Sequence, residues 1–290
     1  MPHILSLIAP HGHGGLTGAI LDRVAARHGT ARVLAPGDAA EFVCEAAPDV
    51  AAVVDMLDGA AVDAVVTPAE GRRKRLLVAD MDSTIVTGET LDELAVFGGV
   101  GEQVAAITRR SMNGELDFAA ALRERVALLR GLPLAALERT WGGVRLTPGA
   151  AVLVRTMRAH GAYAALVSGG FTWFTGRVAE MCGFDVHRAN RLLDDGAALL
   201  GTVDEPILDR GAKLVALRAF AGVRGVGLGD ALAVGDGAND LDMIGAAGLG
   251  VAYHAKPIVA AEARVRIDHA DLRALLYIQG YAAGEFAPDA

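Results

Sequence analysis

Short apolar runs alternate with longer amphipathic segments along most of this chain. Four of these runs, at residues 75–80, 163–170, 230–237 and 248–254, are rich in Val, Leu, Ala and Gly. Such runs are typical of strands buried on both faces of a sheet, and the segments between them have the period of amphipathic helices. The alternation of strand and helix predicts an α/β fold with a doubly wound, parallel, Rossmann-like sheet.

One long stretch interrupts this alternation. From about residue 90 to 145 the apolar positions follow a helical period, with no strand pattern among them. An insertion after the first strand would lie over the carboxyl ends of the sheet, where ligands bind in open α/β folds. We therefore predict a helical cap over the binding edge. A β-hairpin that turns at Asp195 and Gly196 is predicted beside the sheet.

Residues 1–70 have a different pattern, in the order strand, helix, strand, strand, helix, strand. This order predicts a small ferredoxin-like α+β domain. Its net charge is −6, against −2 for the rest of the chain, and the basic run at 71–75 predicts a solvated linker before a larger unit at 76–290. The N-terminal domain resembles ACT-type regulatory modules, which implies an amino-acid effector and pairing into a homodimer. The sequence itself leaves the oligomeric state open.

Composition narrows the class of protein. With 52% hydrophobic and 21% charged residues the chain is globular, and its formal net charge of −8 argues against nucleic-acid binding. Neither a signal peptide nor an apolar stretch of roughly 20 residues is found, so we expect no membrane association. The two cysteines, Cys44 and Cys182, offer no disulfide framework, which favours the reducing cytoplasm. Small-molecule chemistry is the remaining class.

Carboxylates follow two of the predicted strands. Asp80 and Asp82 come directly after the first, and Asp236 and Asp240 lie in a Gly-rich loop after another. Either motif alone fits an ordinary turn or a weak cation site. In one parallel sheet, however, both would lie at the same edge, where close carboxylates repel unless a cation lies between them. Oxygen ligands suit Mg²⁺, so the pattern predicts a magnesium site.

Ser168 and Lys213 point to an anion at the same edge. Ser168 lies in "LVSGGF", whose glycine amides can hold an anionic oxygen. Lys213 is predicted near a helix start, where the macrodipole opposes a cation unless an anion is bound. An ordinary surface lysine is the alternative for Lys213.

The motifs "DMDST", "SGG", "AK" and "GDGAND", in this order, resemble the haloacid dehalogenase superfamily of phosphohydrolases. The longer stretches "DMDSTIVTGETLDELA" and "VSGGFTWFT" are similar to the phosphoserine phosphatase family. The resemblance implies hydrolysis of O-phospho-L-serine to L-serine and phosphate through an aspartyl phosphate, as the last step of serine biosynthesis. It makes Asp80 the nucleophile and Asp82 the general acid and base.

The same resemblance assigns the remaining site residues. Asp80, Asp236 and the backbone carbonyl of Asp82 would bind Mg²⁺, with Asp240 acting through water or by fixing Lys213. For Arg125 the alternative is a solvated helix arginine paired with Glu124 or Asp117. The other implied roles are phosphate binding by Ser168, Gly169, Lys213 and Asn239, ammonium binding by Glu89, carboxylate binding by Arg125, and apolar closure by Met112 and Phe118.

Two other readings stay open at this point. A related enzyme would act on another small phosphomonoester or transfer the phosphoryl group to an acceptor such as homoserine. A non-catalytic amino-acid sensor would use the N-terminal unit alone, but the presence of both Asp80 and Asp82 argues against it.

Overall fold

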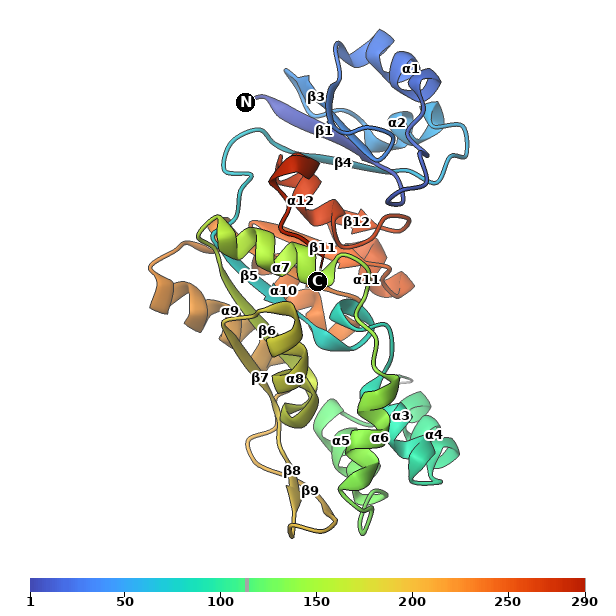
Figure 1. The fold of residues 1–290 in the computed structure, drawn as a ribbon, viewed down its shortest axis with the longest axis vertical. Helices are drawn as coiled ribbons and strands as arrows, with labels where there is room; N and C mark the ends of the chain where they lie inside the picture. Colours follow the sequence, from blue (N-terminus) through green and yellow to red (C-terminus); the bar gives the residue numbers. More distant parts are fainter. Residues whose placement is uncertain (113–114, 290) are drawn as a thin grey trace.

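The computed structural model of the protein describes residues 1–112 and 115–289. Its parts follow one another along the long axis, with the N-terminal unit at one end, the α/β unit in the middle and the helical cap at the other end (Figure 1). Within the described ranges, no helix has the length and apolar character that a membrane span requires.

The α/β unit is built on a parallel sheet, which among the described residues has six strands in the order β12-β11-β10-β5-β6-β7. The chain winds outward from β5 in both directions, so the topological switch point lies between β5 and β10. The doubly wound sheet is therefore confirmed. The strands are β5 (Leu76–Ala79), β6 (Tyr163–Phe171), β7 (Val186–Asn190), β10 (Ala231–Gly235), β11 (Leu249–Tyr253) and β12 (Val265–Ile267).

Helices cover both faces of this sheet because successive side chains of a strand point to opposite sides. Leu77 and Ala79 pack with helices α7, α8 and α12, whereas Leu76 and Val78 pack with α9 and α10. All four side chains are fully buried, as their continuous apolar pattern predicts. The helices are α7 (Ala150–Ala159), α8 (Thr172–Cys182), α9 (Arg210–Arg224), α10 (Leu241–Ala246), α11 (Pro257–Glu262) and α12 (Ala274–Ile278).

The helical cap is inserted between β5 and α7, as predicted. It consists of α3 (Thr90–Phe97), α4 (Gly101–Met112), α5 (Phe118–Ala127) and α6 (Ala135–Gly143). The predicted hairpin is also present, as β8 (Leu192–Asp194) and β9 (Leu199–Val203), and it lies against the cap (Figure 1). The backbone N–H of Leu199 donates to the carbonyl of Leu132 in the α5–α6 loop, with an N···O distance of 2.9 Å. Hairpin and cap are thus hydrogen-bonded together.

The N-terminal unit has the ferredoxin-like order. Its antiparallel sheet has the strand order β2-β3-β1-β4. Leu5 and Phe42 pack under its two helices, while Ile8 and Val65 face the other way and join the core of the α/β unit. The resemblance to ACT modules and the boundaries at residues 70 and 76 stay predictions. The elements are β1 (His3–Ile8), α1 (Gly18–His28), β2 (Arg32–Ala35), β3 (Ala39–Cys44), α2 (Val50–Met56) and β4 (Asp63–Pro68).

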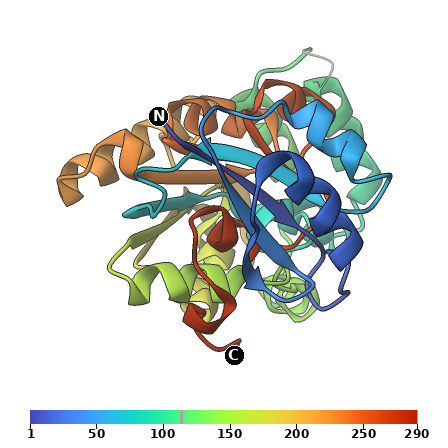
Figure 2. The ribbon, with the colours of Figure 1, turned by 90° about the horizontal axis from the view of Figure 1, so that it is seen from above.

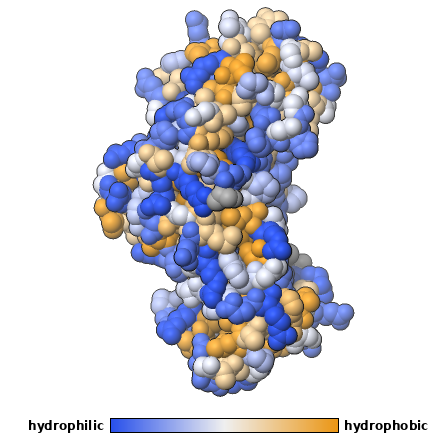
Figure 3. Space-filling model, in the orientation of Figure 1, coloured by the Kyte–Doolittle hydropathy of each residue, from blue (hydrophilic) through white to orange (hydrophobic). Residues whose placement is uncertain are grey.

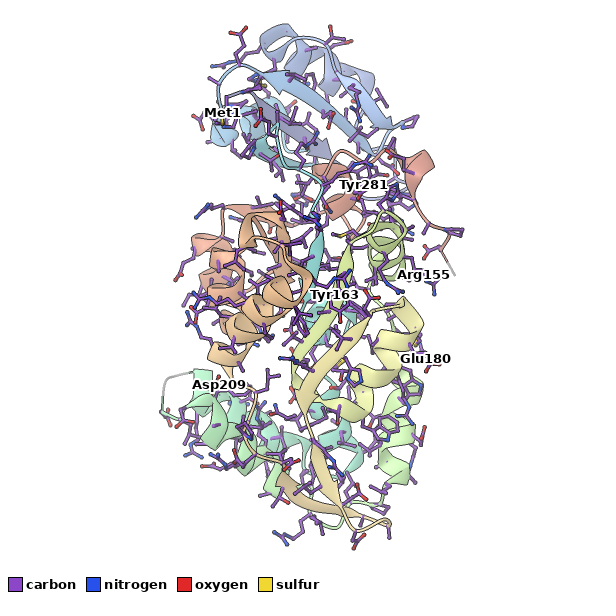
Figure 4. The ribbon with its side chains drawn as sticks, turned by 90° about the vertical axis from the view of Figure 1, so that its left-hand side faces the viewer. Met1, Arg155, Tyr163, Glu180, Asp209 and Tyr281 are labelled. Atoms are coloured by element: carbon purple, nitrogen blue, oxygen red, sulfur yellow. The ribbon has the colours of Figure 1, made fainter. Side chains whose placement is uncertain are left out.

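The C-terminal part of the chain, from α12 onward, covers the face of the N-terminal sheet that carries no helices. Seen from the N-terminal end, the strands of that sheet cross in front of the α/β unit (Figure 2), and Tyr281 lies between the two (Figure 4). Polar contacts join them as well. The buried Glu41 carboxylate lies 2.7 Å from an Arg72 guanidinium nitrogen. Arg72, in the basic run after residue 70, is therefore held at this seam by an ion pair.

Asp63 at the start of β4 accepts three backbone N–H groups of the α/β unit. These belong to Asp268, His269 and Ala270, with N···O distances of 2.8, 3.2 and 2.9 Å. The Asp63 side chain is buried, so no water replaces these bonds if the carboxylate is removed. Asp63 thus joins the two units through three backbone hydrogen bonds.

We expect Asp63→Ala to lower the free energy of unfolding by about 3 kcal/mol, because it leaves buried N–H donors without an acceptor. Urea unfolding followed by circular dichroism measures the change. Asp268→Ala is the matched control: it removes only an exposed ion pair with Arg266 and should cost less than about 1 kcal/mol. Equal small losses in both variants would show that the Asp63 bonds do not stabilise the seam.

Candidate active site

The site lies at the carboxyl edge of the parallel sheet, at the switch point between β5 and β10. Asp80 follows β5 and Asp236 follows β10. Because these strands are neighbours, the Asp80 N–H donates to the carbonyl of Val234 at 3.0 Å. Carboxylate oxygens of Asp80, Asp236 and Asp240 all lie within 4.8 Å of one another, and the three residues are buried. The two carboxylate motifs therefore converge at one edge of the sheet, as predicted.

Lys213 provides the cation that this cluster requires. It extends from the first turn of α9, and its Nζ lies 2.8 Å from Asp80 Oδ1 and 2.6 Å from Asp240 Oδ1. Burial alone would lower the pKa of Lys213, but the two carboxylates outweigh it and raise that pKa, so the ammonium form persists. Lys213 is only 1% exposed, which excludes an ordinary surface lysine.

The Gly-rich loop after β10 leaves room for Asp240. A Cβ on Gly235 would lie 2.3 Å from Asp240 Cγ, so any residue other than glycine at position 235 would clash with the Asp240 side chain. The N–H of Gly237 donates to Asp240 Oδ2 at 3.1 Å. Glycine is thus required for close approach of the backbone to a carboxylate, and Asn239 follows in the same loop, half-buried.

Asp236 has two contacts that the sequence did not predict. The Thr84 hydroxyl donates to its Oδ1 at 3.5 Å, and Lys256 Nζ lies 3.5 Å from its Oδ2. Burial and the Asp80 charge raise the pKa of Asp236, while Lys256 and Lys213 oppose that rise. Lys256 follows strand β11, so its place after another apolar run was the signal that could have found it.

The Asp82 carboxylate turns away from the cluster. Its Oδ1 accepts the N–H of Thr90 at 2.9 Å, and its Oδ2 accepts the Ser168 hydroxyl at 3.4 Å. Ser83 has a φ of 55°, in the left-handed region, so the chain turns directly after Asp82. Burial, then the charges of Glu89 and Asp80, raise the pKa of Asp82 to about 7 although the Thr90 bond opposes them. Such a carboxyl group can hold and release a proton near neutral pH.

The "SGG" segment at the end of β6 forms the wall beside Asp82. The buried Ser168 Oγ accepts the N–H of Gly170 at 2.9 Å, and Asn190 Nδ2 donates to the carbonyl of Gly169 at 2.8 Å. A Cβ on Gly170 would lie 2.8 Å from Asp82 Oδ2. Ser168 and Gly169 are therefore fixed next to the acid, as an anion site requires.

The cap contributes side chains from above. Glu89 Oε1 accepts the Ser83 hydroxyl at 2.9 Å, and the protein around Glu89 raises its pKa by displacing water. Phe118 lies against Gly169, since a Cβ on that glycine would be 2.9 Å from the ring. Met112 ends α4, and its side chain lies outside the described part of the structure.

Arg125 is half-buried on α5 and lies near the acids of the site. Burial lowers its pKa, whereas the charges of Asp92 and Glu89 raise it. Glu124 instead pairs with Arg110, at 3.0 Å. Asp117 accepts the N–H of Ala120 as the cap of α5. The alternative from the sequence was that Arg125 pairs with Glu124 or Asp117. The structure shows neither pair among the described residues.

Comparison with protein families agrees with this geometry. The family model described as haloacid dehalogenase-like hydrolase matches residues 77–245, more than half of the chain. The chain belongs to the haloacid dehalogenase-like hydrolases. The matched range holds both carboxylate motifs, the "SGG" segment and Lys213, as well as the whole cap.

Relatives of this hydrolase include phosphoserine phosphatases. That of Streptomyces coelicolor is 44% identical over 214 residues, which cover 74% of this chain and 52% of the relative. The chain thus spans about half the length of such curated relatives. The unliganded structure of a probable phosphoserine phosphatase from Vibrio cholerae is 32% identical with a TM-score of 0.80, and the match covers 98% of this chain and 88% of that one. A phospho-aspartyl intermediate analogue of phosphoserine phosphatase is 41% identical with a TM-score of 0.66, covering 71% and 98%.

The carboxylate cluster of this hydrolase fits a hard divalent cation. Three buried carboxylates supply only oxygen donors, which Mg²⁺ prefers, and Lys213 balances one of the three negative charges. Asp82 does not join them through its side chain. Its backbone carbonyl stays a predicted ligand, as do the individual roles assigned to the site residues.

We expect Lys213→Met to lower the free energy of unfolding of the metal-free hydrolase by about 3–5 kcal/mol, because two buried carboxylates lose the ammonium that contacts both of them. Added MgCl₂ should restore part of this loss, since a cation that binds the folded state stabilises it. Urea unfolding with and without MgCl₂ measures both effects. Arg218→Met, on the exposed side of the same helix, is the control and should change stability little. A loss that is no larger than that of the control would refute the structural role of Lys213.

Proposed function

We propose that this chain hydrolyses O-phospho-L-serine to L-serine and phosphate through an aspartyl phosphate. One observation carries the proposal: Asp80 and Asp82, two residues apart, have different partners. Asp80 lies in the carboxylate cluster with Asp236 and Asp240. The Asp82 side chain lies against Ser168 instead, and its pKa is raised to about 7. A nucleophile and a proton donor require this division of environments.

Asp80 is the nucleophile of the proposed reaction. Its Oδ1 accepts the N–H of Met81 at 2.8 Å and the Lys213 ammonium at 2.8 Å, so both donors hold the carboxylate in one orientation. An Asp80 oxygen forms a bond to phosphorus as the bond from phosphorus to the serine oxygen breaks. Water then attacks phosphorus and releases Asp80.

Asp82 is the proton carrier in both steps. As a protonated acid it gives its proton to the departing serine oxygen, and as a carboxylate it takes a proton from the attacking water. The Thr90 N–H and the Ser168 hydroxyl fix the direction of this carboxyl group. Its fixed position lets one residue act in both directions without moving.

Charge on the phosphoryl group is offset from several sides. Asp80, Asp236 and the Asp82 carbonyl would hold Mg²⁺, with Asp240 acting through water or by fixing Lys213, and the bound ion would supply electrostatic stabilisation of the phosphoryl oxygens. Ser168, Gly169, Lys213 and Asn239 provide the protein's own donors. Preorganised donors of this kind act strongly where water is excluded.

Selection of phosphoserine comes from the cap in this proposal. Glu89 binds the substrate ammonium and Arg125 its carboxylate, for which a guanidinium offers two parallel N–H donors. Glu124 pairs with Arg110 and Asp117 caps α5, so neither of these carboxylates occupies the Arg125 guanidinium. Phe118, with Met112, closes the apolar side of the site.

The setting and control of the enzyme belong to the proposal as well. Serine biosynthesis in the cytoplasm is the pathway, and the ACT-like unit binds an amino-acid effector as a homodimer. Val33 and Val43 are half or more exposed on this unit, and Figure 3 shows apolar patches over it.

A phosphate-release panel tests the activity directly. We expect phosphoserine to be hydrolysed faster than phosphothreonine or an aryl phosphate, only with Mg²⁺, and with no transfer to added homoserine. Asp80→Asn should lower the rate by about 10³-fold or more because the nucleophile is lost, while the circular dichroism spectrum is retained. Asp242→Asn removes an exposed carboxylate on α10 and should leave the rate unchanged. Unchanged turnover in Asp80→Asn would refute the nucleophile assignment.

Arg125→Ala tests the substrate assignment. We expect kcat/KM for phosphoserine to fall about 100-fold, since a buried charge-assisted contact is lost, and kcat/KM for an aryl phosphate without a carboxylate to change less than about threefold. Arg123→Ala is the control. Arg123 lies on the same helix as Arg125, is exposed, and pairs with Glu205. Similar losses for both substrates would show that Arg125 does not recognise the carboxylate.

A further inference from the structure

Lys256 lies at the catalytic edge but outside the motifs described above. It follows β11, the strand beside β10, and its backbone N–H donates to the carbonyl of Asp236 at 3.1 Å. Its ammonium Nζ lies 3.5 Å from Oδ2 of the same residue. Backbone and side chain therefore both attach Lys256 to Asp236, so its position does not depend on a flexible side chain alone.

The acids of the site divide between two lysines. Lys213 contacts Asp80 and Asp240, and it is buried between them. Lys256 contacts Asp236 instead, and its charge also acts on Glu89. The two ammonium groups thus contact different carboxylates of the cluster, although the charges of both act on Asp236.

The two lysines differ in freedom. Lys213 is fixed by two short ion pairs, whereas the Lys256 side chain is 48% exposed and makes one longer contact. An ammonium held at 3.5 Å has N–H donors that still point to solvent or to a ligand. Lys256 can therefore leave Asp236 at little cost, which Lys213 cannot.

We propose that Lys256 is a resident cation that holds Asp236 Oδ2 in the metal-free protein, competes with the divalent cation for it, and then binds the phosphoryl group of the substrate. Its ammonium neutralises the outer side of the cluster until the metal arrives. Once displaced, it lies at the mouth of the site, where an incoming phosphate brings negative charge. This inference rests on the proposed function for its last step only.

The competition has a definite sign. An ammonium beside Asp236 repels a second cation at the same carboxylate, so its removal should tighten Mg²⁺ binding. The same removal takes a positive charge from the path of the phosphate, so substrate should bind more weakly. A residue that only supported the local structure would weaken both.

Calorimetric titration of the metal-free full-length protein with MgCl₂ tests the first half. We expect Lys256→Met to bind Mg²⁺ on the order of tenfold more tightly than the wild type. Lys256→Arg keeps the charge and should restore the wild-type affinity to within about threefold. Arg264→Met is the matched control. Lys256 precedes helix α11 and Arg264 follows it, and the exposed Arg264 side chain forms no ion pair with an acid among the described residues.

Steady-state kinetics test the second half. In Lys256→Met the KM for phosphoserine should rise about tenfold with kcat changed much less, and Lys256→Arg should reverse the rise. Mg²⁺ affinity that stays the same or falls in Lys256→Met, an equal gain in Arg264→Met, or an unchanged KM overturns the proposal. The titration needs no substrate, so a wild type that binds Mg²⁺ but leaves phosphoserine intact would overturn the proposed function alone.

Discussion

Repulsion among buried carboxylates is the constraint on which the site depends. Oxygens of Asp80, Asp236 and Asp240 lie within 4.8 Å of one another where little water reaches them. Unpaired charges in such surroundings cost several kcal/mol each. Lys213 offsets part of this repulsion and leaves a net negative site, which attracts a divalent cation. The stability of the fold and the affinity for metal are thus set by the same charges.

Parallel strand pairing brings these charges together. β5 and β10 are neighbouring strands, although Asp80, at the end of β5, and Asp230, just before β10, are 150 positions apart in the sequence. The topological switch point between these two strands opens the edge of the sheet to a ligand. The cap and the β8–β9 hairpin cover that edge and are joined by backbone hydrogen bonds. In the proposed reaction, the residues that break the bond lie on the sheet, and the residue that binds the substrate carboxylate, Arg125, lies on the cap.

The N-terminal unit is attached through polar contacts as well as apolar ones. Asp63 and the Glu41–Arg72 pair lie within its interface with the α/β unit. A groove of about 400 Å³ lies beside Asp63 between α2, β4 and residues 264–269. This seam therefore lies at β12, the outermost strand on one side of the parallel sheet, where residues 268–270 follow the strand.

The sequence by itself predicted the doubly wound sheet, the cap, the ferredoxin-like order and the motif residues, because strand patterns and turn residues are local properties. It missed the edge strands β7 and β12, which are short and carry polar residues. Only the tertiary structure turned Asp82 toward Ser168, placed Thr84 and Lys256 on Asp236, and left Arg125 without Glu124 as a partner. These contacts join segments far apart in the chain, so their distances depend on packing and not on any local pattern.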